Sequence, residues 1–376
     1  MQTPADFLTT SKTLEIAFPP ATERAAEAVV RATKVSTIPQ GAEPRWIILG
    51  DPAKALPVLK SWRPFKLSSQ VQWNAVLLAS SMKLLSRLPN VKSDEAFVDK
   101  QYWQTRLEGF SDRWNVVVHV GNSSYTRKAI VFFVAEDASI KAVAKVPLTS
   151  AAGVAILNEA HVLRHMQTVD DLPRVLFDDA QRGVAAQTFL DGKAVSRRFT
   201  PRHVELLGRM VNEGATTRLY SFRPEILSAL DALDLPVDRT LIQRAVGFLD
   251  FEGELPEFVE HRDFAPWNIK RLPDGRLTLL DWEWAVQKSL PWQDMCRYFY
   301  IQDVLFHGPG KVWEKLTNDP LIRGYVQKFA IPVESLPGLT MYYLLRVLCM
   351  DWKNKDRSLT DYTLKQIKTL VEIHRR

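Results

Sequence analysis

Three polar residues in one short segment have the types and the spacing that phosphoryl transfer requires. Asp263 carries a carboxylate that can accept a proton from an attacking hydroxyl. Asn268 lies five residues after it and Asp281 eighteen residues after it, and both carry oxygen atoms that can hold a hard cation such as magnesium. The segment therefore predicts a base next to a cation that neutralises a triphosphate.

A turn signal explains how residues so far apart in sequence can share one cation. Residues 272–275 read Leu-Pro-Asp-Gly, and residues 276–280 have the composition of a returning strand. The resulting hairpin brings Asn268 and Asp281 to the same end. The alternative is an acidic, tryptophan-rich surface hairpin without chemistry, because single motifs also occur by chance.

The segment resembles the protein-kinase-like superfamily, and within it the aminoglycoside phosphotransferase and choline kinase branch. That branch has His-Gly-Asp-x4-Asn, then Ile/Leu-Asp-Trp, then Pro-x-x-Asp. This chain has His261-Arg-Asp-x4-Asn268, then Leu280-Asp-Trp, then Pro291-x-x-Asp294. Arg262 is a departure, since the branch usually has glycine there and protein kinases have arginine.

The resemblance implies catalytic roles for Asp263, Asn268 and Asp281, with Asn268 and Asp281 as the metal ligands. It implies ATP and Mg²⁺ as cofactors. It also implies that His261 braces the catalytic loop and that Asp294 ties this loop to a helix through backbone amides.

The implied fold is α+β: a bilobal protein-kinase-like fold with a small lobe and a large, mostly helical lobe. The small lobe would hold a five-stranded antiparallel sheet plus a helix, with strands at 116–120, 129–134, 140–146, 173–177 and 183–190. The expected domains are an N-terminal extension of residues 1–105, a small lobe of 106–190 and a helical lobe of 191–376, whose first helices include one over 202–214.

Several small-lobe residues are implied to bind the nucleotide. Gly121, Ser123 and Ser124 belong to a turn of small polar residues between two strands, although a plain hairpin turn would look the same. Lys145, preferred over Lys141 because it follows the apolar run, would pair with Glu159 and contact the α- and β-phosphates. Thr188, Phe189 and Leu190 would form the backbone hinge that meets adenine.

The gap between Asp281 and Pro291 indicates the kind of acceptor. Protein kinases use a long activation segment closed by Ala-Pro-Glu as a peptide platform, and this chain has only nine residues there and no such motif. A small acceptor with a hydroxyl is therefore expected, and the segment 282–292 should lie at the mouth of its pocket. Glu283 could assist a second metal or an acceptor hydroxyl, or equally be an exposed acid beside two tryptophans.

The identity of the acceptor is less constrained. Residues 351–376 carry seven basic and four acidic residues, so no acidic cluster awaits a polycation. Aromatic residues suit sugar rings as well as quaternary amines. We favour a sugar-like acceptor or glycan precursor over an aminoglycoside-type or choline-type cation. Two further hypotheses stay open: an inactive nucleotide-binding pseudokinase with a regulatory role, and an enzyme that transfers a nucleotidyl group. The aromatic residues expected to line the acceptor surface are Trp282, Trp284, Trp292, Tyr298, Phe299 and Tyr300.

Residues 1–105 lie outside these motifs and have no assigned role. Residues 22–32 have a helical composition, and Ser68 precedes a second helix that reaches Leu88 with an apolar face containing Val71 and Leu78. The basic and aromatic segment 60–66 is typical of a membrane-surface or lipid-linked-substrate contact. A helix that simply packs on the small lobe is the favoured alternative.

Composition fits an ordinary globular enzyme. The net charge is +6 with basic residues spread along the chain, and nothing indicates a nucleic-acid partner. Cys296 and Cys349 lie in apolar surroundings and are expected to be free thiols. His161 and His165 have no third ligand at a zinc spacing. The sequence shows no export signal and no transmembrane stretch, so a cytoplasmic location is expected.

Overall fold

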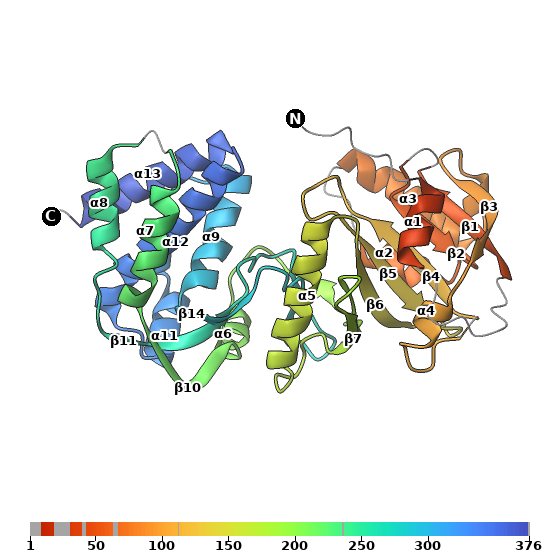
Figure 1. The fold of residues 1–376 in the computed structure, drawn as a ribbon, viewed down its shortest axis with the longest axis horizontal. Coiled ribbons are helices and arrows are strands. Elements are labelled where there is room, and N and C mark those ends of the chain that lie inside the picture. The colour runs from red at the N-terminus through yellow and green to blue at the C-terminus, as the bar shows by residue number, and fades with distance from the viewer. Residues whose placement is uncertain are drawn as a thin grey trace. The chain divides into compact units, whose positions relative to one another are not determined.

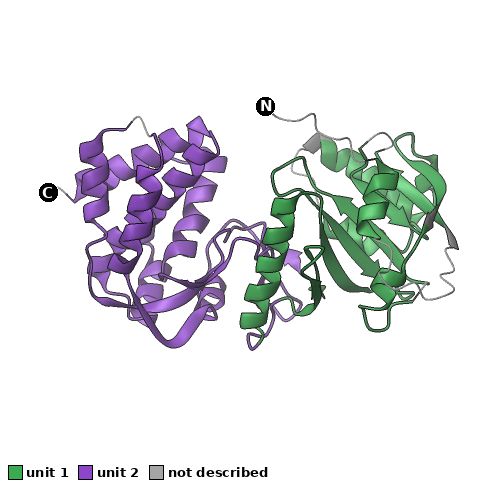
Figure 2. Ribbon diagram, viewed as in Figure 1, with its two compact units in different colours: residues 1–167, 173–191 green, residues 168–172, 192–376 purple. Residues whose placement is uncertain are grey.

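The computed structural model is α+β, with a large antiparallel sheet and many helices. The chain forms two compact units (Figure 2): unit 1 contains residues 1–167 and 173–191, and unit 2 contains residues 168–172 and 192–376. The described residues are 9–18, 31–39, 43–62, 67–111, 113–234 and 237–374.

Unit 1 is built on one eight-stranded sheet in the order β3-β1-β2-β4-β5-β6-β8-β7, with every pairing antiparallel. Its strands are β1 Arg31–Ile38, β2 Trp46–Leu49, β3 Lys92–Val98, β4 Asn115–Val120, β5 Lys128–Val134, β6 Ile140–Pro147, β7 Val175–Asp179 and β8 Val184–Thr188.

The expected five-stranded sheet is wrong in its extent, because β1, β2 and β3 continue it beyond β4. In this pairing Ile48 of β2 lies opposite Val117 of β4. The three consecutive valines of β4 are fully buried, so both faces of that strand need cover and it is an interior strand. Residues 22–30 of the helix expected over 22–32 lie outside the described residues, and the chain is already extended from Arg31.

Each face of the sheet has its own core, as the period of two along a strand requires. Val116 and Val118 join a core with α1 (Thr10–Ala17) and α4 (Gln101–Gln104). Val117 points the other way, into a core with α2 (Leu56–Ser61) and α3 (Leu67–Ser81).

Helix α5 (Ser150–His165) packs against β6, β7 and β8 (Figure 1). Thr149 caps its first turn by accepting from the backbone N–H of Ala152. Two glycines allow the close approach: a Cβ at Gly183, which has φ +67°, would lie 2.7 Å from the Cα of Gly153. The helix is therefore held at a fixed height over the sheet.

Unit 2 combines helices with two three-stranded sheets, β10-β11-β14 and β13-β12-β9. The strands are β9 Lys193–Ala194, β10 Val211–Arg218, β11 Glu254–Glu260, β12 Ile269–Arg271, β13 Leu277–Leu279 and β14 Val286–Ser289. The helices are α6 Pro201–Gly208, α7 Arg223–Asp231, α8 Arg239–Gly247, α9 Gln293–Leu305, α10 Val312–Asn318, α11 Pro320–Lys328, α12 Leu336–Lys353 and α13 Arg357–Ile373.

The helix expected over 202–214 is wrong in its second half. Helix α6 ends at Gly208, and Val211–Arg218 is a strand that pairs with β11. The segment contains two adjacent threonines and a glycine with φ +73°, and both features favour extended or turn backbone over helix. No helix among the described residues is long and apolar enough to span a membrane.

We expect a buried histidine to make unit 2 sensitive to acid. Nδ1 of His203 accepts from the backbone N–H of Thr200 at 3.1 Å, and burial lowers the pKa of His203 to about 4. The unfolded chain binds a proton near pH 6.5, so stability is lost as pH falls from about 6.5 towards 4. When the pH is lowered from 7 to 5, the free energy of unfolding of His203→Gln should therefore fall by about 1–2 kcal/mol less than that of the wild type.

Urea unfolding at both pH values, followed by circular dichroism, measures this difference. His307→Gln changes an exposed histidine of the same unit and should behave like the wild type. An unaltered pH dependence in His203→Gln would contradict the assignment.

Candidate active site

Strand β11 ends at Glu260, and the next eight residues form a loop that presents Asp263. One carboxylate oxygen of Asp263, Oδ2, accepts a hydrogen bond from Asn268 Nδ2 at 2.8 Å. The same Nδ2 donates to the backbone carbonyl of Asp263 at 2.9 Å. Because the amide nitrogen of Asn268 is used in this way, its carbonyl oxygen is the atom that can hold a cation.

The other carboxylate oxygen of Asp263 belongs to an ion pair that the motifs did not indicate. Arg297 Nη2 donates to Asp263 Oδ1 at 2.7 Å. Burial opposes the charge of Arg297, but Tyr343 and Asp263 outweigh it and raise the pKa of Arg297. Arg297 lies three residues after Asp294 on α9, and residues three apart on a helix share a face. This spacing was the signal in the sequence that Arg297 faces the same loop as Asp294.

His261 braces this loop, as the resemblance implied. Its Nδ1 accepts from the backbone N–H of Asp263 at 3.2 Å, and its Nε2 lies 3.0 Å from the carbonyl of Leu280. Only the neutral tautomer with the proton on Nε2 satisfies both bonds. The ring also packs edge-on against Trp282 at 4.9 Å. His261 thus links the loop to the far strand of the hairpin.

Asp294 ties the loop to α9 through backbone amides, as predicted. Its Oδ2 and Oδ1 accept from the N–H groups of His261 and Arg262 at 2.8 and 2.9 Å. The carboxyl group is buried beside Glu260, and burial followed by the charge of Glu260 raises the pKa of Asp294. Arg346 of α12 donates to Glu260 Oε2 at 2.7 Å and supplies the balancing positive charge.

The hairpin predicted from Leu272–Gly275 is present, and it carries the second acid of the site. Strands β12 and β13 pair with Ile269 opposite Leu279, and the N–H of Leu280 donates to the carbonyl of Asn268 at 2.8 Å. This bond brings the backbone entering Asp281 next to Asn268. Asp281 itself has φ +69°, a conformation that turns the chain away from the strand.

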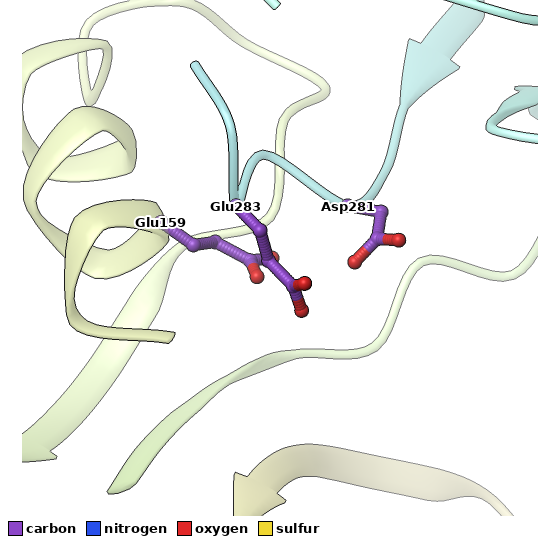
Figure 3. Close-up of side chains that lie close together, drawn as sticks. All are labelled: Glu159, Asp281 and Glu283. Atoms are coloured by element: carbon purple, nitrogen blue, oxygen red, sulfur yellow. The ribbon is translucent and has the colours of Figure 1, made fainter. Parts of the chain in front are cut away.

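Glu283 is a buried partner of Asp281, and the alternative of an exposed acid is wrong. Its side chain is 5% exposed, and its ligand oxygen lies within 4.8 Å of one on Asp281. Figure 3 shows both carboxyl groups projecting from the same side of the loop after β13. Two carboxylates this close repel each other unless a cation lies between them.

In unit 1 the predicted lysine–glutamate pair is formed. Lys145 Nζ lies 2.5 Å from Glu159 Oε2, and the two side chains are buried between β6 and α5, from which Glu159 projects (Figure 3). Lys141, the competing lysine on the same strand, is instead exposed and pairs with Asp137 at 3.7 Å. Lys145 is therefore the lysine of this strand that is held in a fixed position.

The turn between β4 and β5 contains Gly121, Ser123 and Ser124, and the two serines are exposed. A Cβ at Gly121 would lie 2.8 Å from the carbonyl of Lys128, so the backbone approach there requires glycine. Arg127 is buried and its Nε donates to the carbonyl of Gly121 at 3.1 Å. This brace was not visible in the sequence.

The three expected hinge residues lie at the end of unit 1. Thr188 is the last residue of β8, and its N–H donates to the carbonyl of Arg174 at 2.9 Å. Phe189 and Leu190 follow as half-buried residues without regular structure. Unit 1 ends one residue later, at Asp191.

The expected aromatic surface is largely wrong, because most of its members belong to the core. Trp282, Trp292, Tyr298 and Tyr300 are at most 2% exposed. Trp292, for example, donates from Nε1 to Thr340 Oγ1 at 2.9 Å. Trp284, at 53% exposure, remains on the surface, and Trp267 on the loop after β11 adds a second exposed ring at 38%.

No protein-family model and no curated protein matches the chain. Several solved structures do match the chain. One is a putative aminoglycoside phosphotransferase from Ralstonia eutropha, with 12% identity, a TM-score of 0.48, and coverage of 72% of this chain and 94% of that one. Another is a macrolide 2'-phosphotransferase from Brachybacterium faecium, with 14% identity, a TM-score of 0.45, and coverage of 66% and 91%. A choline kinase from Streptococcus pneumoniae has 11% identity, a TM-score of 0.44, and coverage of 73% and 97%.

The similar structures are small-molecule phosphotransferases by name.

The departure at Arg262 gives a stability prediction. Arg262 has φ +66°, which costs an L-residue about 1–2 kcal/mol, whereas glycine adopts this conformation freely and loses about 0.5–1 kcal/mol through chain entropy. Arg262→Gly should therefore leave stability unchanged or raise it by about 1 kcal/mol, measured by urea unfolding. Arg271→Gly, a change at an exposed position in β12, is the control and should destabilise. A comparable loss in both variants would contradict the argument.

Proposed function

We propose that this chain is an ATP-dependent phosphotransferase that phosphorylates a hydroxyl of a small molecule. The observation that carries the proposal is the arrangement around Asp263. Its carboxylate is oriented by Asn268 and Arg297, on a loop that two further side chains brace. A carboxylate held in this way is suited to accept a proton from an alcohol as the alcohol attacks phosphorus.

The nearby oxygen atoms suit a magnesium ion. The amide nitrogen of Asn268 is occupied, and the carboxylates of Asp281 and Glu283 lie together at the end of the hairpin. This is a set of hard oxygen donors without nitrogen or sulfur, which Mg²⁺ favours. Asn268 and Asp281 would hold the ion with the phosphates of ATP, and Glu283 would add a carboxylate. The ion would neutralise charge on the phosphates.

Unit 1 supplies the proposed nucleotide contacts. Lys145 would contact the α- and β-phosphates, with Glu159 fixing its position. Gly121, Ser123 and Ser124 would cover the phosphates with backbone N–H groups and hydroxyls. The backbone of Thr188, Phe189 and Leu190 would meet adenine.

A direct assay tests the proposal. The protein is incubated with ATP, magnesium and pooled hydroxyl compounds, which include sugars, amino alcohols and aminoglycosides, and the release of ADP is measured. We expect ADP release that depends on one acceptor class. Release of pyrophosphate in place of ADP would indicate nucleotidyl transfer, and absence of turnover with every acceptor would reject the enzyme.

Two substitutions separate the proposed base from the proposed metal ligand. Asp263→Asn should lower kcat by about 10²- to 10⁴-fold, because it removes the proton acceptor, while ATP still binds. Asp281→Ala should abolish magnesium-dependent binding of ATP, because it removes a ligand of the ion. Titration with ATP at fixed magnesium, together with kcat, distinguishes them. Identical titration curves for the two variants would show that this division of roles is wrong.

We further propose that the acceptor is neutral or anionic and sugar-like. The two exposed tryptophans in this part of unit 2, Trp267 and Trp284, offer ring faces on which a sugar can stack. Trp267 lies directly before Asn268 in the chain, and Trp284 directly after Glu283. The position of both rings beside proposed catalytic residues favours contact with an acceptor.

Trp284→Ala should therefore raise the KM for the acceptor about three- to ten-fold and leave the KM for ATP unchanged, since a stacked ring contributes on the order of 1 kcal/mol. Steady-state kinetics with the acceptor found in the screen measures both constants. Tyr220→Ala removes a ring of similar exposure, 46%, elsewhere in unit 2 and should change neither. An equal effect of both variants would exclude a specific role for Trp284.

A further inference from the structure

Helix α3 packs on unit 1 through one apolar stripe and leaves a second stripe exposed. Trp73, Val76 and Ala79 are at most 9% exposed and belong to the core beneath the sheet. Val71 and Leu78, which the sequence placed on the apolar face, are 68% and 61% exposed. Helix α3 therefore packs on unit 1, as the favoured alternative expected. It does so through the face with Trp73, Val76 and Ala79, next to the face that the sequence predicted. The exposed stripe consists of Val71, Ala75, Leu78 and Met82 just past the end of the helix.

An apolar groove continues this stripe. It has a volume of about 370 Å³, and Ala75 belongs both to its lining and to the stripe. Three tryptophans line it, with Trp62 and Trp73 in edge contact at 4.9 Å and Trp46 5.4 Å from Trp73. The stripe and groove together form one apolar surface, called the α3 surface below.

Basic residues accompany the α3 surface. Residues 51–92 contain seven lysines or arginines and a single acid, Asp51; of the seven, Arg63 and Lys66 lie outside the described residues and Lys92 pairs with Asp94 at 2.6 Å. Lys60, Lys83 and Arg87 are exposed, and no ion pair among the described residues engages them. The carboxylate of Asp51 is engaged by its own turn, because Asp51 Oδ1 accepts a hydrogen bond from the backbone N–H of Ala53 at 2.9 Å.

Charge decides which partner fits the α3 surface. A second copy of the chain would bring the same uncompensated lysines and arginines together across a symmetric contact, which is unfavourable. Protein interfaces in general are depleted of lysine at their centre. Exposed aliphatic residues on a helix, an adjoining tryptophan-lined groove and exposed basic residues on the segments that flank the helix are instead the combination that binds anionic lipid headgroups and the acyl region below them.

We propose that the α3 surface binds an anionic lipid surface. Val71, Leu78 and Met82 enter the boundary between headgroups and acyl chains, and the tryptophan-lined groove receives apolar lipid atoms. Lys60, Lys83 and Arg87 contact the anionic headgroups. The attachment is peripheral and reversible, because it uses one short helical stripe. This inference is independent of the proposed catalytic activity.

Co-sedimentation of the full chain with vesicles tests the proposal. We expect the protein to bind vesicles of three parts phosphatidylcholine to one part phosphatidylglycerol, and to bind pure phosphatidylcholine at least about ten-fold more weakly, since each basic residue near an anionic surface contributes on the order of a five-fold effect. Binding to the mixed vesicles should fall as salt is raised.

Two variants locate the contact. Val71→Glu with Leu78→Glu should lower partitioning at least ten-fold, because charged residues do not enter the acyl boundary. Lys60→Glu, Lys83→Glu and Arg87→Glu together should lower it by about 100-fold or more. The matched controls are Val333→Glu, whose side chain is also 68% exposed, and Arg323→Glu with Lys365→Glu and Lys368→Glu, all exposed in unit 2. Circular dichroism of each variant checks that it is folded.

Loss of binding in the α3 variants and retention in the controls would establish the proposal. Three results would overturn it: no binding to the mixed vesicles, equal binding to both compositions, or retained binding in the folded α3 variants. Light scattering tests the remaining possibility, that a second copy of the chain covers the α3 surface. A dimer that Leu78→Glu dissociates would assign the surface to a second copy of the chain instead.

Discussion

The site in unit 2 depends on one carboxyl group that holds two consecutive backbone amides. Asp294 accepts from the N–H groups of His261 and Arg262, and these bonds fix the turn after β11. The turn passes through a conformation that is unfavourable for arginine, at φ +66°. Once it is fixed, the direction of Asp263 follows, because its own N–H bonds back to the His261 ring.

Burying the charged groups that hold this turn is unfavourable unless their charges are balanced. Glu260 and Asp294 are neighbouring buried acids, and Arg346 from α12 supplies the cation beside them. Burial opposes the ionisation of Glu260, but the charge and hydrogen bonds of Arg346 lower its pKa overall. Arg297 balances the charge of Asp263 in the same way, through an ion pair. Two helices that come after the loop in sequence therefore determine its electrostatics.

Unit 1 uses its sheet in two different ways. The half around β6 positions Lys145 against Glu159, in a pair fixed by a helix that approaches closely at two glycines. The face formed by β1 and β2, with Val117 of β4 and Val134 of β5, buries one side of α3, and the other side of the helix is exposed. A single continuous sheet thus supports a candidate nucleotide contact at one end and an apolar, basic surface at the other.

The sequence by itself determined what is local. It predicted the hairpin between Asn268 and Asp281 from a turn signal between two short strands, and the resemblance that its motifs carry implied the Lys145–Glu159 pair and the bracing roles of His261 and Asp294. The tertiary structure decided what depends on packing between distant segments. Arg297, Arg346 and Arg127 became partners only through folding, and Trp282 and Trp292 proved to be core residues, since an aromatic side chain has the same sequence signature in a core as on a surface.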